Sequence, residues 1–444
     1  MTNKISTPIA DFVKDYAGRG GVRLHMPGHK GKGSFGFEKF DITEINGADA
    51  LYEAEGIIAE SEKNASMLFG TAKTVYSTEG SSQCIRAMMY LIALNSKKGR
   101  RPVVLAARNV HKTFVFAAAL LDMDVRWLWP EENNSICSCP LSAEMIKEAL
   151  DECDADAFYI TSPDYLGEMA DIRAIADVCH KKGAVLAVDN AHGAYLHFLK
   201  DSLHPMDMGA DICCDSAHKT LPVITGGAYL HISKNAPAMF SEQAKYAMAL
   251  FGSTSPSYLC IASLDMCNAY LAEGYREKLT KTVLRTEKAK KELCINGYET
   301  VASDPLKITI KVPLALTGAY MADRLREKGI ECEYADPDYI VLMVTPENDE
   351  EDFERLAAAL GKADAPGRKA EVSITKAERV LSIREAVMSP SETVRTDEAE
   401  GRICRVPTVS CPPAIPVVVP GERISREAVE VLRYYDIKEV DVIK

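Results

Sequence analysis

The chain has 444 residues and a mass of 48.6 kDa, more than one ordinary domain holds, so two or three packed units are expected. With 47% hydrophobic and 26% charged residues, the composition excludes a fibrous or disordered protein. Lys and Arg number 52 against 64 Asp and Glu, and this net charge of −12 disfavours binding to nucleic-acid phosphates or to an anionic membrane.

The thirteen cysteines have no spacing typical of a disulfide framework or a zinc site. The only close pairs are Cys137 with Cys139 and Cys213 with Cys214. We therefore expect free thiols, a reducing compartment and no metal. The N-terminus carries two aspartates where a signal peptide needs an apolar core, and no apolar run approaches the ~18 residues of a membrane span. A cytoplasmic location is expected.

From about residue 60 to 235, short β-rich runs alternate with longer helical patterns. One helix is predicted between Asp171, its N-cap, and Gly183, its C-terminal stop. Seven strands are predicted: Thr71–Ser77, Pro102–Ala107, Asp124–Trp129, Asp156–Thr161, Ala184–Asp189, Ala210–Cys214 and Gly227–Ile232. The alternation indicates an α/β domain with a large, mostly parallel seven-stranded sheet, which binds ligands beyond the carboxyl ends of its strands.

After a helical stretch near 258–295 the pattern changes to a smaller C-terminal α+β domain. Its predicted elements are the strands Lys307–Val312, Glu331–Ala335 and Tyr339–Thr345 and the helices Thr317–Lys328, Glu351–Leu360 and Ala377–Val387. A polar segment, 361–371, reads as a linker, and a Pro-rich loop follows at 411–422. We expect an N-terminal arm at 1–40, a large domain at 41–295 and a small domain at 296–444.

Two motifs follow neighbouring predicted strands. In SAHKT (216–220), Lys219 stands beside Ser216 and His218, where a desolvated amine could form a Schiff base with an aldehyde cofactor, or could be a surface lysine. In VDNAHG (188–193), Asp189 ends an apolar strand, where its carboxylate could pair with a pyridinium nitrogen or cap a helix. The 30 residues between Asp189 and Lys219 leave room for one strand, which would place both groups at one sheet edge.

Two further strand ends complete a constellation. Gly80, Ser81 and Ser82 lie in a turn before a helix, where they could cradle a phosphate or simply cap the helix. His111 follows the next strand and could cover a planar ring or cap the helix after it. No P-loop or dinucleotide-binding glycine pattern is present at these positions, which disfavours ATP and dinucleotides.

Five motifs in this order resemble those of the Orn/Lys/Arg decarboxylase family, pyridoxal-phosphate enzymes of fold type I, the aspartate-aminotransferase fold. They are HMPGHKGKG (25–33), VDNAHG (188–193), SAHKTL (216–221), STSPSYLCIASLD (253–265) and CPPAIPVVVPGE (411–422). The resemblance extends from about Thr7 to Arg423 and is to the short form, which lacks an N-terminal receiver-like domain.

The resemblance implies a role for each predicted site residue. Lys219 would hold pyridoxal 5′-phosphate as an internal aldimine, Asp189 would pair with the pyridine nitrogen, and His111 would stack on the ring. His192 would lie beside the cofactor, and Thr254 would come from the neighbouring subunit of a homodimer with shared sites. The phosphate would be held by Gly80, Ser81, Ser82, Ser216 and His218.

The implied reaction is decarboxylation of arginine, lysine or ornithine to an amine of the polyamine pathway, with Lys219, His111, Asp189 and His192 as catalytic residues. The proton donor to the substrate's α carbon stays open among His192, His218 and Lys219. The chain departs from the family pattern at Glu79, Asp164-Tyr165-Leu166, Asn190, Tyr195 and Gly226. These departures leave two alternatives: another fold-type-I reaction, such as transamination or another lyase step, and a non-catalytic regulatory homologue. Glu79 and Asp164 either add negative charge that suits a basic substrate or lie at the surface.

Overall fold

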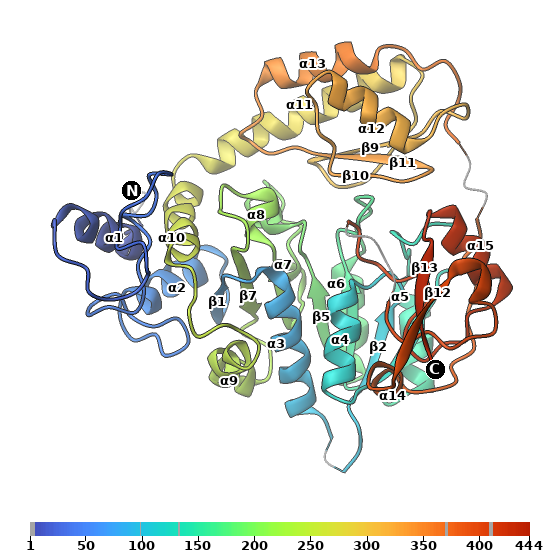
Figure 1. Cartoon of the computed structure of the whole chain (residues 1–444), viewed down its shortest axis with the longest axis horizontal. Helices are drawn as coiled ribbons and strands as arrows, with labels where there is room; N and C mark the ends of the chain where they lie inside the picture. Colours follow the sequence, from blue (N-terminus) through green and yellow to red (C-terminus); the bar gives the residue numbers. More distant parts are fainter. Residues whose placement is uncertain (1–4, 98, 132–133, 369–371, 408–411) are drawn as a thin grey trace. The chain divides into compact units, whose positions relative to one another are not determined.

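The main sheet of the computed structural model has seven strands in the order β1-β7-β6-β5-β4-β2-β3 (Figure 1). Its strands are β1 Lys73–Ser77, β2 Val103–Ala107, β3 Asp124–Leu128, β4 Ala157–Thr161, β5 Val185–Asp189, β6 Ile212–Asp215 and β7 Ala228–Ile232. The pairs β2–β3, β2–β4 and β5–β6 are parallel, whereas β7 pairs antiparallel with both β1 and β6. The seven predicted strands and the mostly parallel α/β sheet are confirmed.

The structure describes residues 5–97, 99–131, 134–368, 372–407 and 412–444. Parts of the predicted arm (1–4), of the predicted linker (369–371) and of the Pro-rich loop (411) lie outside the described residues. The chain divides into two units, Met1–Asn95 with Val185–Lys278, and Ser96–Ala184 with Leu279–Lys444.

The first unit contains strands β1, β5, β6 and β7, whose apolar residues are almost entirely buried. Helix α3, a long helix after β1, packs on β6 and β7, as expected for strands covered by helices. The helices of this unit are α1 Pro8–Gly18, α2 Ile57–Leu68, α3 Gly80–Asn95, η1 Ala194–Phe198, α7 Pro205–Met208, α8 Ala217–Thr220, α9 Ala238–Ala249 and α10 Tyr258–Ala272. Helix α11, Tyr275–Ile295, starts here and continues into the second unit.

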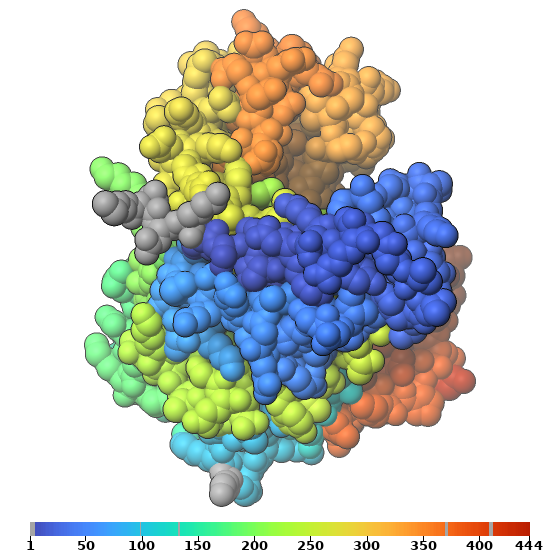
Figure 2. All heavy atoms as spheres, turned by 90° about the vertical axis from the view of Figure 1, so that its left-hand side faces the viewer, coloured from blue at the N-terminus to red at the C-terminus, as the bar shows by residue number. Residues whose placement is uncertain are grey.

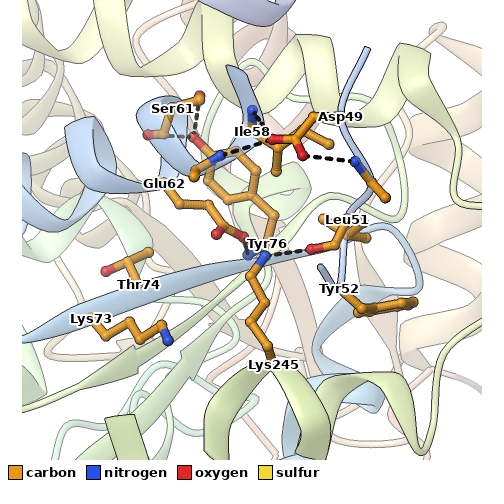
Figure 3. A network of polar contacts seen from close by, with 12 residues as sticks. Asp49, Leu51, Tyr52, Ile58, Ser61, Glu62, Lys73, Thr74, Tyr76 and Lys245 are labelled. Atoms are coloured by element: carbon orange, nitrogen blue, oxygen red, sulfur yellow. Dashed lines mark hydrogen bonds and ion pairs between the residues drawn. The ribbon is translucent and has the colours of Figure 1, made fainter. Parts of the chain in front are cut away.

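A buried polar network ties the N-terminal helices of this unit to β1 (Figure 3). Glu62 on α2 accepts hydrogen bonds at one oxygen from the Lys245 ammonium, at 2.6 Å, and from the Tyr76 backbone N–H, at 2.9 Å. Asp265 on α10 accepts the backbone N–H groups of Ile9 and Ala10, which satisfies the first turn of α1. The strand that leads to the predicted phosphate loop is therefore fixed by side chains as well as by its sheet partners.

The second unit contains β2, β3 and β4 with helices α4 Lys112–Leu120, α5 Ala143–Glu152 and α6 Ile172–Lys181. Asp171 caps α6 through the Ala174 N–H and Gly183 follows its end with a φ of +70°, both as predicted. A second sheet, in the order β10-β11-β9-β8, carries helices α12 and α13 and confirms the smaller α+β fold (Figure 1). These elements are β8 Thr300–Val301, β9 Lys307–Lys311, α12 Gly318–Glu327, β10 Tyr334–Ala335, β11 Tyr339–Met343 and α13 Glu350–Leu360.

The predicted helix Ala377–Val387 is wrong in its first half. Helix α14 covers only Ile383–Val387 and begins at a capping box between Ser382 and Glu385. Before it, Arg379 forms a β-bridge with Glu422, and the backbone of residues 380–381 donates to the Gly421 carbonyl. Long-range backbone pairing thus overrides the local helical pattern. The remaining elements are β12 Ser391–Arg395, η2 Thr396–Glu398, α15 Arg426–Tyr434 and β13 Glu439–Ile443.

All twelve cysteines among the described residues are free, as predicted. Nine of them are buried, Cys153 and Cys332 are half-buried, and Cys294 is exposed. None of the helices in the described part of the chain has both the length and the apolar character needed to cross a membrane.

Candidate active site

The Lys219 side chain lies against His192 in the first unit. Lys219 belongs to the short helix α8 directly after β6, and its Nζ is 3.0 Å from His192 Nε2. His192 is only 4% exposed and Lys219 is half-buried. Lys219 is therefore not a fully exposed surface lysine. Its amine is partly shielded from water and has the His192 imidazole as a hydrogen-bond partner.

Asp189 ends β5 as a buried carboxylate. Its Oδ1 accepts a hydrogen bond from the Ala191 N–H at 3.2 Å, and the Cys214 thiol lies 3.7 Å from the same oxygen. The next helical turn begins only at Ala194, so Asp189 does not cap a helix. In the β5–β6 pairing Asp189 stands opposite Cys214, five residues before Lys219, and β6 is the single strand predicted between them.

The predicted phosphate cradle comes together from three segments. Gly80 begins α3 with a φ of +70°, and its N–H donates to the Gly226 carbonyl at 2.7 Å. Ser216 Oγ donates to Ser81 Oγ at 2.8 Å, and a Cβ at Gly80 would stand 3.9 Å from the His218 ring. The amino end of a sixteen-residue helix thus meets two hydroxyls and an imidazole, a combination suited to an anion.

Glu79 and Thr254 lie in two exposed segments that contact each other next to this cradle. Thr254 is exposed at the surface of the single chain. Glu79, directly before Gly80, accepts a hydrogen bond from the Ser253 N–H at 2.5 Å. Glu79 is exposed, and this bond links it to the segment that contains Thr254.

His111, in the second unit, is the N-cap of α4, since its Nδ1 accepts the Thr113 N–H at 3.2 Å. The capping alternative is thus observed. A hydrogen bond in the plane of an imidazole leaves the ring face available for stacking, so both readings of His111 are compatible.

The loop that carries His111 is supported by the Pro-rich segment of the same unit. Arg108 is 4% exposed, and its guanidinium donates to the carbonyls of Pro416 and Val417 at 2.8 and 2.9 Å. The Lys112 N–H donates to the Ala414 carbonyl at 2.8 Å. Sequence patterns alone did not identify Arg108, because its partners lie about 300 residues away in the chain.

Asp164 is buried rather than at the surface. It is 5% exposed, and burial raises the pKa of its carboxyl to about 6. It lines a cavity of about 800 Å³ beyond the carboxyl ends of β2 and β4. Four carboxylates and no Lys, Arg or His are among the described residues of its lining, which also includes the buried, unpaired Oδ1 of Asn109. The carboxylates are Glu131, Asp164, Glu168 and Asp171.

Two departures from the family pattern have a local structural reason. Gly226 has a φ of +99°, and a Cβ there would stand 2.6 Å from the Thr78 carbonyl oxygen, so this backbone admits no side chain. Tyr195 is 1% exposed and is part of the core of the first unit. These two residues are therefore explained by packing.

A buried cluster was not predicted. His204, Asp215 and His231 bring their ligand-type atoms within 4.8 Å of one another, the single such group of possible metal ligands among the described residues. The sequence predicts no metal site because it lacks the closely spaced pairs of ligands that zinc usually needs, whereas these three residues come from three segments. A carboxylate at the end of the buried strand ICCD was the one available signal.

A mostly parallel sheet with an amine, a carboxylate and an anion cradle at its carboxyl edge defines the aspartate-aminotransferase class of fold. Solved structures agree: the lysine decarboxylase LdcF of Francisella novicida superposes with a TM-score of 0.81 at 18% identity, covering 100% of this chain and 82% of that one. Serine palmitoyltransferase of Sphingomonas wittichii gives 0.57 at 14% identity, over 81% and 84% of the two chains.

Sequence comparison narrows the class to a family. The family model described as Orn/Lys/Arg decarboxylase, major domain, matches residues 7–301, and that of the C-terminal domain matches residues 370–440. An arginine decarboxylase of Bacillus subtilis is 29% identical over 98% of this chain and 94% of its own length. The chain belongs to the Orn/Lys/Arg decarboxylase family.

Proposed function

We propose that this protein removes the α-carboxylate of arginine, lysine or ornithine with bound pyridoxal 5′-phosphate, giving CO₂ and an amine of the polyamine pathway. The observation that carries the proposal is that Lys219, 3.0 Å from His192, lies on the short helix directly after β6, the strand next to the one that ends in Asp189. The family membership and the arginine decarboxylase relative support the same reaction.

The residues present fit this cofactor. It requires an amine for its aldehyde, a carboxylate for its ring nitrogen and donors for its phosphate, and the first unit supplies each of them. Lys219 and Asp189 would provide the first two. The α3 amino end, with Ser81, Ser82, Ser216 and His218, would bind the phosphate. His111 would stack on the ring.

Pyridoxal 5′-phosphate, when bound, supplies an electron sink for the electron pair that departing CO₂ leaves on the α carbon. Asp189, a buried carboxylate, would keep a proton on the ring nitrogen and so favour that flow. His192 Nε2, 3.0 Å from Lys219 Nζ, would hold or return the proton that the amine exchanges with substrate. His192, His218 and Lys219 are the candidates to protonate the α carbon.

Charge supports a basic substrate. The cavity that Asp164 lines has four carboxylates and no basic side chain among its described lining residues. Asp164 itself is a desolvated carboxyl that a cation would stabilise in its ionised form. The net charge of −12 would attract a cationic amino acid at long range. We include Asp164 among the residues that favour a basic side chain.

We further propose a homodimer with shared sites. Large apolar side chains of the N-terminal arm are exposed in the single chain, with Val22 87%, Leu24 92% and Phe35 83% accessible. This arm, dark blue in Figure 2, lies at the surface of the first unit. We propose that a second copy covers these side chains; the family resemblance implies that each copy also contributes Thr254 to its partner's site.

The remaining assignments follow from the same family. We propose a cytoplasmic location, which the free cysteines support. We also propose the division into an arm at 1–40, a large domain at 41–295 and a small domain at 296–444 with a linker near 361–371. The family match to residues 7–301 ends close to the proposed boundary between the large and the small domain.

The test is product analysis. Protein loaded with pyridoxal 5′-phosphate is incubated separately with arginine, lysine and ornithine, and released CO₂ and the amine are measured together. We expect release from one of the three in equal amounts of CO₂ and amine. A keto acid in place of the amine would indicate an aminotransferase, and cofactor-loaded protein that releases CO₂ from none of them would contradict the proposal.

A further inference from the structure

The unpredicted cluster centres on Asp215, the last residue of β6, which is fully buried. Its Oδ2 lies 2.9 Å from His204 Nε2 and 3.2 Å from His231 Nε2. Its Oδ1 accepts a hydrogen bond from Asn190 Nδ2 at 2.7 Å. One carboxylate thus serves three donors from three different segments. Neither histidine was a predicted site residue, and the proposed mechanism uses neither of them.

The partners on the far side of each ring show which atoms carry protons. His204 Nδ1 accepts the Met206 N–H, so its Nε2 bears the hydrogen that Asp215 accepts. Burial lowers the pKa of His231 despite the neighbouring Asp215, which favours the neutral imidazole. In that form Nε2 donates to Asp215 at 3.2 Å and Nδ1 accepts from the Thr74 hydroxyl at 2.8 Å. Burial opposes ionisation of Asp215, but the two imidazoles outweigh it and hold the pKa of that carboxyl below its ordinary range.

Asn190 connects this cluster to the turn between Asp189 and His192. Besides its side-chain bond, its N–H donates to the Cys214 carbonyl at 3.0 Å, and its carbonyl accepts the Gly193 N–H at 2.8 Å. A Cβ at Gly193 would stand 2.0 Å from Asn190 Oδ1, so the side chain fits only against a glycine. The turn is therefore hydrogen-bonded to the end of β6 through both the backbone and the side chain of Asn190.

We propose that Asn190 and Asp215 are a positioning pair, in which an amide on one strand end and a carboxylate on the other fix the turn that presents Asp189 and His192 to the cofactor. The proposal rests on the cofactor assignment above. It also explains the departure at position 190: an acidic residue there would face Asp215 with no proton between them, whereas an amide donates.

Because Asp215 accepts hydrogen bonds from three donors, exchanging the amide and the carboxylate between positions 190 and 215 tests the pair. In Asp215→Asn, the new amide offers one oxygen, and its NH₂ group must face one of three existing donors. Asn190→Asp sets two carboxylates against each other. In the double variant, Asn190→Asp with Asp215→Asn, the amide at 215 donates to the carboxylate at 190 and its oxygen accepts from both histidines. Every donor again has an acceptor.

The experiment measures the pyridoxal 5′-phosphate dissociation constant from visible absorbance, and the thermal unfolding of cofactor-free chain, for wild type, both single variants and the double. Each single change should weaken cofactor binding by roughly tenfold or more, because it removes a hydrogen bond to a charged group. The double should return to within about threefold of wild type. Coupling in the unfolding of cofactor-free chain tests the pair even if the cofactor assignment fails.

Asp211→Asn is the matched control, since Asp211 is a buried aspartate at the amino end of the same strand and accepts the Leu186 N–H. It should lower thermal stability and leave the absorbance and cofactor affinity unchanged. A fold-loss of cofactor affinity in the double variant equal to the product of the fold-losses in the two single variants would overturn the proposal. So would failure of all three variants to fold while Asp211→Asn folds, and so would one equivalent of metal in wild-type protein that Asp215→Asn loses.

Discussion

The ion pair between Glu62 and Lys245 allows a quantitative test of how β1, the strand before the proposed phosphate-binding turn, is supported (Figure 3). Glu62 is 5% exposed, and the oxygen that binds Lys245 at 2.6 Å also accepts the Tyr76 N–H. Lys245→Met would leave this carboxylate buried without its charge partner. Loss of one partner of a buried pair costs about 3–5 kcal/mol, a large share of the ~5–15 kcal/mol that stabilises a typical protein.

The effect should depend on pH. Burial raises the pKa of Glu62 against the opposing charge of Lys245. A group with a raised folded pKa stabilises the fold while it is protonated, and that contribution declines as the pH rises through the folded pKa. Without Lys245 the pKa rises further, so the decline extends to higher pH. The loss in free energy of unfolding that Lys245→Met causes should therefore be smaller near pH 5 than near pH 8, where it should reach about 3–5 kcal/mol.

Urea unfolding followed by circular dichroism at both pH values measures the difference. Lys234→Met, at an exposed lysine of the same unit, is the control and should change little. Adding Glu62→Gln to Lys245→Met should recover stability near pH 8, because the buried charge is then absent. An equal loss at both pH values, or no recovery in the double variant, would refute the reasoning.

Three further outcomes are expected. Lys219→Ala mixed with pyridoxal 5′-phosphate should lack both the visible absorbance of a Schiff base and decarboxylase activity, and retained activity would remove Lys219 from its role. Gly226→Gln should lower the free energy of unfolding by about 2 kcal/mol or more, measured in urea, because its φ is +99° and its Cβ would meet the Thr78 carbonyl at 2.6 Å; an unchanged value would contradict this. In wild type, the raised pKa of Asp164, about 6, should make the free energy of unfolding decline as the pH rises from about 4 to 6. Asp164→Asn should make this decline smaller. Urea unfolding at several pH values checks the slope, and a wild-type slope would count against it.

The sheet could be predicted from sequence because its signals are local. Buried strands such as β5 are runs of apolar residues, and α6 has its cap and its stop in the sequence itself. The amine at 219, the carboxylate at 189 and the serines at 81 and 82 could be predicted for a related reason. Each directly follows or ends a strand, so the sheet topology alone places them at one edge.

Features that depend on distant partners could not be predicted. The 377–387 pattern favours a helix, but backbone pairing with residues 421–422 extends its first half. The Asp215 cluster joins side chains from four segments, and its histidines stand alone in the sequence with no periodic neighbours. The periodicity and spacing of residues predict local structure within one helix or strand. They do not predict contacts between residues that are distant in the sequence.

The carbonyl groups at 414, 416 and 417 are the hydrogen-bond acceptors of the loop that presents His111. Although separate family models match the two ends of the chain, the C-terminal portion cannot be exchanged as an independent module. In a chimera that carries the C-terminal segment of a relative, the His111 loop would keep its position only if that segment offered the same three carbonyl oxygens to Arg108 and Lys112. Recombination points within this family are therefore constrained by a handful of main-chain atoms rather than by domain boundaries.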